Sequence, residues 1–171
     1  TPLTGEGWRI ASARTVAEVV RDVEAARQAG AEVVIVSVHV LKEQEPGPIA
    51  QDRQFVADLT AAVRVDLVIG HGPHVVQPVE QLNGAWVYWS VGNFVSGMGR
   101  PGSTRYGPRT LDGLLADVRF VERARGGFDV IPGAVAICNE MTDRTVYPAV
   151  SALADPLIDP ELGSQLADCL A

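Results

Sequence analysis

The run Glu32-Val33-Val34-Ile35-Val36-Ser37-Val38-His39 gives the clearest indication of how this chain folds. Its residues are apolar and β-branched almost throughout, which is typical of a central strand covered on both faces. A second run of this kind, Asp66-Leu67-Val68-Ile69, precedes Gly70 and His71. Because the carboxyl ends of parallel strands meet at one crevice, we expect the loops directly after these strands to bring their histidines together.

Two amphipathic segments alternate with these strands. Residues 15–29 carry valines at helical spacing and end before Gly30, which is a typical helix stop. Residues 49–63 show a second helical pattern after a loop that is rich in proline and glycine. The order helix, strand, helix, strand predicts parallel strands joined by right-handed crossovers, and therefore an α/β protein.

The second half of the chain changes to antiparallel patterns. Asn83-Gly84 lies between two short β-type runs, residues 79–82 and 85–89, and this dipeptide is the strongest short-range hairpin signal. Residues 114–121 and 128–137 form a second predicted strand pair around a glycine-rich turn.

The domain organisation follows from these patterns. Residues 1–171 are predicted to form one domain or the C-terminal half of one. Within it, residues 1–74 hold the crossover units, 75–137 the antiparallel strands, and 138–171 a tail with a short helix near 160–170. Between the strand pairs, residues 96–109 are rich in glycine, proline and arginine and indicate an exposed loop.

Composition excludes several classes of function. The 171 residues are 47% hydrophobic, which suffices for one sizeable core, and the net charge is -7 without a basic cluster, so no nucleic-acid partner is expected. No apolar run approaches the roughly 20 residues that cross a bilayer, so no transmembrane segment is predicted. Because the chain starts at Thr1, we expect a processed or excised piece, with any export signal or anchor upstream.

The two cysteines leave two interpretations open. A disulfide between Cys138 and Cys169 would indicate an oxidising compartment and would connect the final helix to the sheet. On the chain-entropy model, that bridge would stabilise the fold by roughly 3–4 kcal/mol. Alternatively, both are buried free thiols.

The histidines are the strongest functional candidates. His39, His71 and His74 are the only three, and Gly70-His71-Gly72-Pro73-His74 puts two of them in one rigid turn. Rigid imidazoles at one sheet edge suit a divalent metal, because coordination geometry tolerates little slack. The alternative is a generic α/β domain whose histidines only stabilise loops.

Three motifs in order carry a family resemblance: Ile35–His39, Asp66–Pro78 and Tyr88–Phe94. Together they resemble the bacterial capsule-synthesis or poly-γ-glutamate biosynthesis proteins of the CapA type, over residues 15–137. The fold of that family resembles the calcineurin-like metallophosphoesterases. The resemblance implies that this chain forms the C-terminal part of an αββα sandwich.

The resemblance also implies site residues. His39 and Glu43 match the first family motif, although Val40 and Leu41 replace the usual tryptophan and glycine. His74 matches the second motif, but Gly72 stands before the proline, so that the neighbouring ligand is displaced by one position to His71. The metal ligands implied are therefore the three histidines, with Glu43 as the catalytic residue that orients a ligand or accepts a proton.

The third motif implies a substrate-binding element. Ser90, Gly92 and Asn93 keep the family's Ser-x-Gly-Asn-Phe pattern. The alternative is a tight structural turn with Phe94 in the core.

Only half of the two-metal site that the resemblance implies is present in this chain. In the calcineurin-like site that this chain resembles, an amino-terminal half supplies the aspartates and the asparagine-histidine pair that bridge two metal ions, and none of those motifs occurs in this chain. Two cations repel strongly without carboxylates between them, so this chain alone is predicted to be inactive as a two-metal hydrolase. The missing half is the expected intramolecular partner. In the complete protein, a divalent metal would activate water for attack on a phosphoryl or acyl centre.

A different class of function competes with the hydrolase. The altered motifs suit a catalytically inactive binding or scaffold protein of the bacterial cell envelope or the extracellular space. The expected ligand is an anionic polymer or a phosphorylated small molecule. An anionic polymer would be repelled by the acidic surface unless a cation or the loop arginines Arg100, Arg105 and Arg109 intervened.

Overall fold

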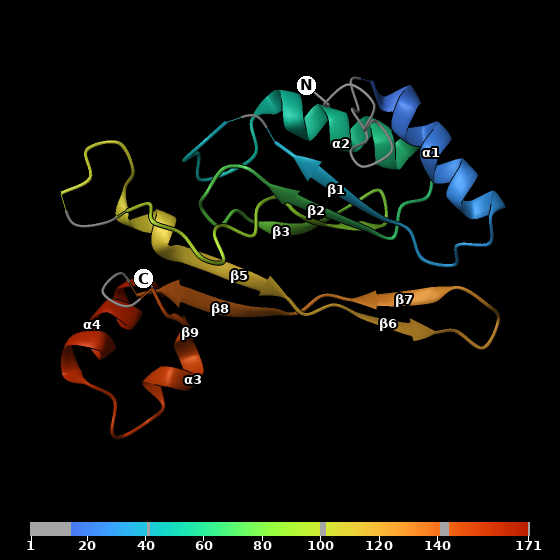
Figure 1. The fold of residues 1–171 in the computed structure, drawn as a ribbon. Coiled ribbons are helices and arrows are strands. Elements are labelled where there is room, and N and C mark those ends of the chain that lie inside the picture. Colours follow the sequence, from blue (N-terminus) through green and yellow to red (C-terminus); the bar gives the residue numbers. More distant parts are fainter. Residues whose placement is uncertain (1–14, 41, 100–101, 141–143, 171) are drawn as a thin grey trace.

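The computed structural model describes residues 15–40, 42–99, 102–140 and 144–170. Leu41 and Arg100, which the motif and charge arguments above mention, lie outside the described residues. The described chain forms a four-stranded sheet that carries two helices on one side, a long antiparallel ribbon beside the sheet, and a small helical C-terminal part (Figure 1).

The first half confirms the predicted alternation. The elements in order are α1 (Val16–Gln28), β1 (Ile35–His39), α2 (Ala50–Ala62) and β2 (Leu67–His71). Strands β1 and β2 are parallel, and their register places His39 opposite His71. Helix α1 begins with a reciprocal capping box in which the Thr15 side chain accepts from the Glu18 amide and the Glu18 side chain accepts from the Thr15 amide.

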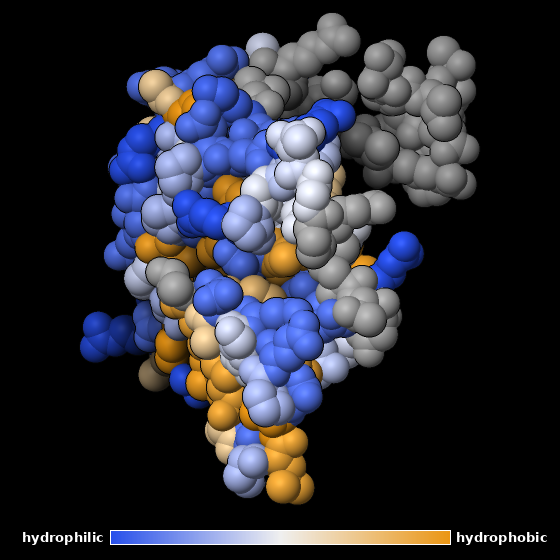
Figure 2. All heavy atoms as spheres, turned by 90° about the vertical axis from the view of Figure 1, so that its left-hand side faces the viewer, coloured by the Kyte–Doolittle hydropathy of each residue, from blue (hydrophilic) through white to orange (hydrophobic). Residues whose placement is uncertain are grey.

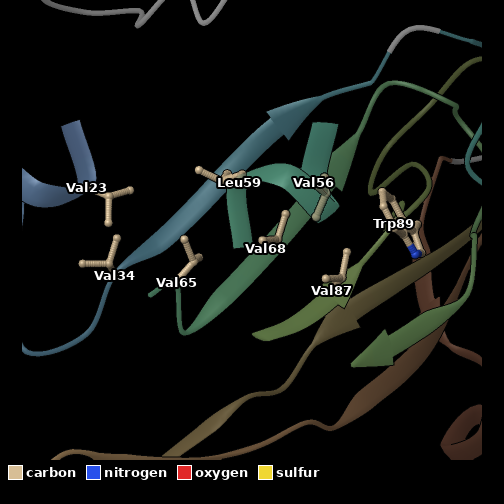
Figure 3. Close-up of a cluster of buried hydrophobic side chains, with 8 residues drawn as sticks. All are labelled: Val23, Val34, Val56, Leu59, Val65, Val68, Val87 and Trp89. Atoms are coloured by element: carbon tan, nitrogen blue, oxygen red, sulfur yellow. The ribbon is translucent and has the colours of Figure 1, made fainter. Parts of the chain in front are cut away.

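The main core lies between the helices and one face of the sheet (Figure 3). Burial of each such aliphatic side chain stabilises the fold by roughly 1.5–3 kcal/mol, so this layer fixes the sheet that carries the histidines. Its buried members come from both helices, from β2, from β4 and from the adjoining loops: Val23, Val34, Val56, Leu59, Val65, Val68, Val87 and Trp89.

The predicted hairpin is confirmed. β3 (Val79–Leu82) and β4 (Ala85–Tyr88) pair antiparallel, and β4 also pairs parallel with β2, so that the sheet order is β1-β2-β4-β3. Asn83 and Gly84 have φ values of 49° and 88°, as a tight two-residue turn of the primed type requires. The mixed α/β class predicted from the sequence is therefore confirmed.

The prediction for β1 as a central strand covered on both faces is wrong. Among the described residues β1 pairs only with β2 and lies at the edge of the sheet. Its valines face the helices, whereas Ile35 is 49% exposed and Ser37 and His39 are also exposed on the opposite face. An apolar run does not distinguish a buried strand from an edge strand, because the alternation of faces appears only when the covering layer is known.

The second predicted strand pair is interrupted. Instead of two long strands at 114–121 and 128–137, the ribbon contains two shorter pairs. At the interruption the Tyr88 hydroxyl accepts from the Gly133 amide at 3.1 Å and donates to the Gly133 carbonyl at 2.8 Å, while that carbonyl also accepts from the Asp117 amide at 2.9 Å. The strands are β5 (Asp112–Ala116), β6 (Arg119–Glu122), β7 (Phe128–Ile131) and β8 (Ala134–Asn139).

The C-terminal part packs on β8. It comprises β9 (Val146–Pro148), α3 (Ala149–Leu153) and the predicted α4 (Pro160–Asp168). In the structure Cys138 and Cys169 form a disulfide that joins β8 to the end of α4. The 3-10 helix η1 (Pro108–Leu111) ends the loop predicted at residues 96–109. No helix in the described parts of the chain is long and apolar enough to cross a membrane.

Candidate functional site

His39 and His71 lie side by side at the carboxyl edge of the sheet. They are the last residues of β1 and β2 rather than members of the following loops, because the parallel ladder extends to them. Their Nδ1 atoms are 3.1 Å apart, and the rings meet edge to face with centroids 5.0 Å apart. The two strands thus bring one pair of predicted ligands into direct contact.

The second ring nitrogen of His71 also has a hydrogen-bond partner. Nε2 lies 3.1 Å from the Ser37 hydroxyl, which comes from the exposed face of β1. Burial lowers the pKa of His71, and the nearby His39 lowers it further. His71 is therefore neutral at pH 7, which is the form in which imidazole binds a metal.

The turn between the histidines is shaped by His39. Gly72 has φ of 115°, and a Cβ atom there would lie 2.6 Å from the Val40 carbonyl oxygen and 3.0 Å from Nε2 of His39. No side chain fits at this position. The glycine before Pro73 thus leaves room for the His39 ring.

His74 is directed to a different partner. Its Nδ1 lies 2.8 Å from Oδ1 of Asn93, while Nδ2 of Asn93 donates to the Thr110 carbonyl at 2.9 Å. Because the amide oxygen can only accept, Nδ1 of His74 carries the hydrogen, and the lone pair of the neutral ring is on Nε2. The Asn93 side chain thus fixes the tautomer of His74.

His74 and Asn93 line a cavity of about 780 Å³. The remaining lining comes from the loop that follows β4: Val95, Ser96, Gly97, Met98, Gly102, Ser103 and Tyr106. His39 and His71 are not part of this lining. The three histidines therefore form two groups, and no set of three or more histidine, cysteine or acidic side chains in the described chain is placed to hold a metal.

The other residues of the motifs have distinct positions. Glu43 is exposed on the connection between β1 and α2. Ser90 is buried and accepts from the Gly92 amide at 3.2 Å, and a Cβ at Gly92 would lie 2.5 Å from the Asp112 carbonyl oxygen. Ser90 and Gly92 thus shape the backbone that presents Asn93. The alternative with Phe94 in the core is wrong, because Phe94 is 60% exposed.

Gln44 is a site residue that sequence reasoning missed. Its Nε2 donates to the Arg105 carbonyl and its Oε1 accepts from the Gly107 amide, both at 3.0 Å. The side chain thereby joins the loop after His39 to the loop that lines the cavity. No local signal identifies it, because the partners are 61 and 63 residues away in the sequence.

The two described arginines of the predicted loop, Arg105 and Arg109, have different surroundings. Arg105 stacks over the Tyr106 ring at 4.9 Å. Arg109 lines a neighbouring cavity of about 620 Å³ together with Asp112 and the disulfide. Figure 2 views this end of the molecule: hydrophilic side chains dominate the upper part, and hydrophobic ones gather below, over the C-terminal α3–α4 part.

The fold and the site together define a class: a mixed α/β protein with paired histidines at the carboxyl edge of parallel strands. The sequence model described as "Bacterial capsule synthesis protein PGA_cap" matches residues 4–98, more than half of the chain. This chain therefore belongs to the PGA_cap family. The matched region includes all three histidines and the Ser90–Asn93 turn.

Curated relatives agree with this assignment. The chain is 32% identical over 102 residues to a protein named "PGA biosynthesis protein CapA" from Bacillus subtilis (strain 168), covering 60% of this chain and 25% of that protein. It is 26% identical over 106 residues to "Capsule biosynthesis protein CapA" from Bacillus anthracis, covering 62% and 24%. The chain thus spans about a quarter of the length of these relatives.

Proposed function

We propose that this chain supplies the histidine-bearing part of a metal-dependent hydrolase site in a capsule or poly-γ-glutamate biosynthesis protein. The observation that carries the proposal is the contact between His39 and His71 at the ends of two adjacent parallel strands. The pair is also partly open to solvent, so that a cation can reach the ring nitrogens.

The spacing of the two rings fits a divalent cation. Nitrogen ligands lie about 2.0–2.1 Å from Zn²⁺, and two of them at a tetrahedral angle are about 3.3 Å apart. The observed separation of 3.1 Å between the Nδ1 atoms is close to this value. A bound metal would polarise a phosphoryl or acyl oxygen and lower the pKa of a bound water.

The remaining residues would handle the substrate. His74, held by Asn93, presents its ring to the cavity of about 780 Å³, where Nε2 can accept a hydrogen bond or a proton. Glu43, exposed on the connection after His39, is the proposed proton acceptor outside this cavity. The substrate class consistent with this chemistry is an anionic polymer or a phosphorylated small molecule.

The site needs further ligands from outside the described residues. His39 and His71 supply two imidazole ligands, whereas a catalytic metal usually has at least three protein ligands. The open edge of β1 and the exposed Ile35 at the start of that strand provide a surface against which another part of the protein can pack. We infer that this part supplies the carboxylates, and that the complete protein acts at the cell envelope.

A second candidate function is an inactive envelope scaffold on the same fold. It is favoured by the division of the three histidines into two groups within the described chain. In that case the His39–His71 pair and the His74–Asn93 pair only stabilise their turns.

Metal titration of the chain separates the two candidates. We expect calorimetry with Zn²⁺ or Co²⁺ to show one binding site, and His39→Ala and His71→Ala each to weaken the binding by at least about tenfold. His74→Ala is expected to leave the affinity unchanged, because His74 belongs to the other group. Equal binding by all variants, or absence of metal from the longer natural protein, would favour the scaffold. Elemental analysis of the longer natural protein then tests whether the completed site retains the metal.

A further inference from the structure

We infer that a second cavity, at the opposite edge of the sheet, binds a neutral saccharide. The cavity has a volume of about 630 Å³, which is within the range of small-molecule sites. It lies between the connection from α2 to β2, the β3–β4 turn and the β6–β7 hairpin. The inference is independent of the proposed metal site.

The two sites are separated by the length of a strand. Asp66, which lines the second cavity, directly precedes β2, whereas His71 ends it. Five strand residues span roughly 13 Å from first to last. In Figure 1 the β6–β7 hairpin extends along the sheet and away from the C-terminal helices, so this cavity is bordered by the far end of the ribbon.

Two aromatic side chains give the cavity apolar surface. Trp86 comes from β4 and Phe128 from β7, and both are half-buried in its lining. The faces of a pyranose ring carry C–H groups and pack well on an aromatic ring, while the hydroxyl groups at its rim need hydrogen-bond partners. An aromatic surface within a polar cavity is therefore suited to a sugar.

The polar groups of the lining are already oriented. Arg64 donates to Oδ1 of Asp66 at 3.0 Å, and Arg123 donates through Nε to Oδ1 of Asp129 at 2.7 Å. The two arginine side chains nevertheless remain 60% and 53% exposed. A guanidinium group has five N–H donors, so each can hydrogen-bond a ligand while its carboxylate fixes its position.

The charge balance favours a neutral ligand. Two guanidinium groups and two carboxylates line the cavity, so the formal charges of the lining residues cancel, while Arg27, which is not part of the lining, also pairs with Asp66. A polyanion would have to compete with Asp66 and Asp129 for the arginines, and it would approach a chain whose net charge is -7. Side-chain amides from Gln81 and Asn83, also in the lining, add donors and acceptors without charge.

Binding of defined oligosaccharides tests this inference. The probes are cellotetraose, the tetramer of N-acetylglucosamine and a short oligomer of γ-linked glutamate, titrated into the 171-residue chain by calorimetry and tryptophan fluorescence. We expect at least one neutral tetrasaccharide to bind. Trp86→Leu and the double variant Arg64→Gln/Arg123→Gln should each weaken that binding by about tenfold or more.

The matched control is Arg119→Gln, which changes an exposed arginine of the same hairpin that does not line the cavity. It should bind as the parent does, and circular dichroism checks that every variant is folded. The inference is overturned if neither saccharide binds at about 10 mM. It is equally overturned if binding survives both cavity variants, or if the glutamate oligomer binds more tightly than the sugars.

Discussion

At the scale of single residues, the site depends on positions where the backbone leaves no room for a side chain. Gly72 is the clearest case, because the carbonyl of Val40 and the ring of His39 both occupy the space of its absent Cβ. The family resemblance predicted a displaced histidine position here, and the steric restriction at Gly72 appears only in the structure. A glycine can lie between the two histidine groups because it alone tolerates this conformation.

Gly72→Ala should therefore destabilise the chain by about 1–3 kcal/mol. The alanine would have to adopt a positive φ, and its Cβ atom would be too close to a backbone carbonyl oxygen. Urea unfolding measures the change. Gly47→Ala is the control, because nothing lies within 4 Å of its Cβ position and its φ is not in the left-handed region. Equal stability of the two variants would contradict the packing described for the turn.

Asp112 gives a pH-dependent prediction at the same scale. Burial raises its pKa to about 6, and Arg109 opposes the shift. A carboxyl group with a raised pKa binds its proton more tightly in the folded state, so its ionisation costs stability as pH rises from about 4 to about 6. Asp112→Asn should thus increase the free energy of unfolding more at pH 7.5 than at pH 4.5. An equal change at both pH values would show that Asp112 titrates normally.

Among the secondary-structure elements, helices and strands follow local sequence signals, whereas the side-chain contacts that hold the connecting segments come from residues distant in the sequence. The capping box at Thr15 and the Asn83-Gly84 turn are visible in the sequence and are found in the structure. The interruption between the two strand pairs lies at Pro132-Gly133, a turn signal in the sequence, but its hydrogen bonds to the Tyr88 hydroxyl from a distant strand are not visible there. The loop that lines the first cavity is likewise fixed by a side chain far away in the sequence.

Gln44→Asn should release that loop. Asparagine tolerates the φ of 61° at this position but is one methylene shorter, so it cannot reach both Arg105 and Gly107. Loss of a hydrogen bond of about 0.5–1.5 kcal/mol should speed hydrogen exchange at the Gly107 amide by about two- to tenfold. Gln54→Asn on the exposed face of α2 is the control and should leave this amide unaffected. Unchanged protection at Gly107 would show that other contacts hold the loop.

At the scale of the whole molecule, the C-terminal part has little core of its own. Its buried cluster comprises only Cys138, Ala149 and Leu166, with half-buried neighbours around them. The disulfide between Cys138 and Cys169 closes a separation of 31 residues and so connects this part to the sheet. The sheet and its two helices have a separate and larger core.

Replacing both cysteines by serine should destabilise the C-terminal part by about 3–4 kcal/mol on the chain-entropy model. Because the cores are separate, we expect early exchange and proteolysis in α3 and α4 while α1, α2 and the parallel strands stay protected. Mass spectrometry of exchanged peptides measures both regions. Uniform loss of protection would show that the chain unfolds as one cooperative unit.

The alternation of helices and parallel strands, the hairpin at Asn83-Gly84 and the family could all be predicted from the sequence. These depend on periodicity, turn residues and short motifs, which are local properties of the chain. The contact of His39 with His71, the contact of His74 with Asn93 and the position of β1 at an edge of the described sheet became visible only in the folded chain. Strand register and loop packing bring together residues tens of positions apart, and no local pattern specifies those distances.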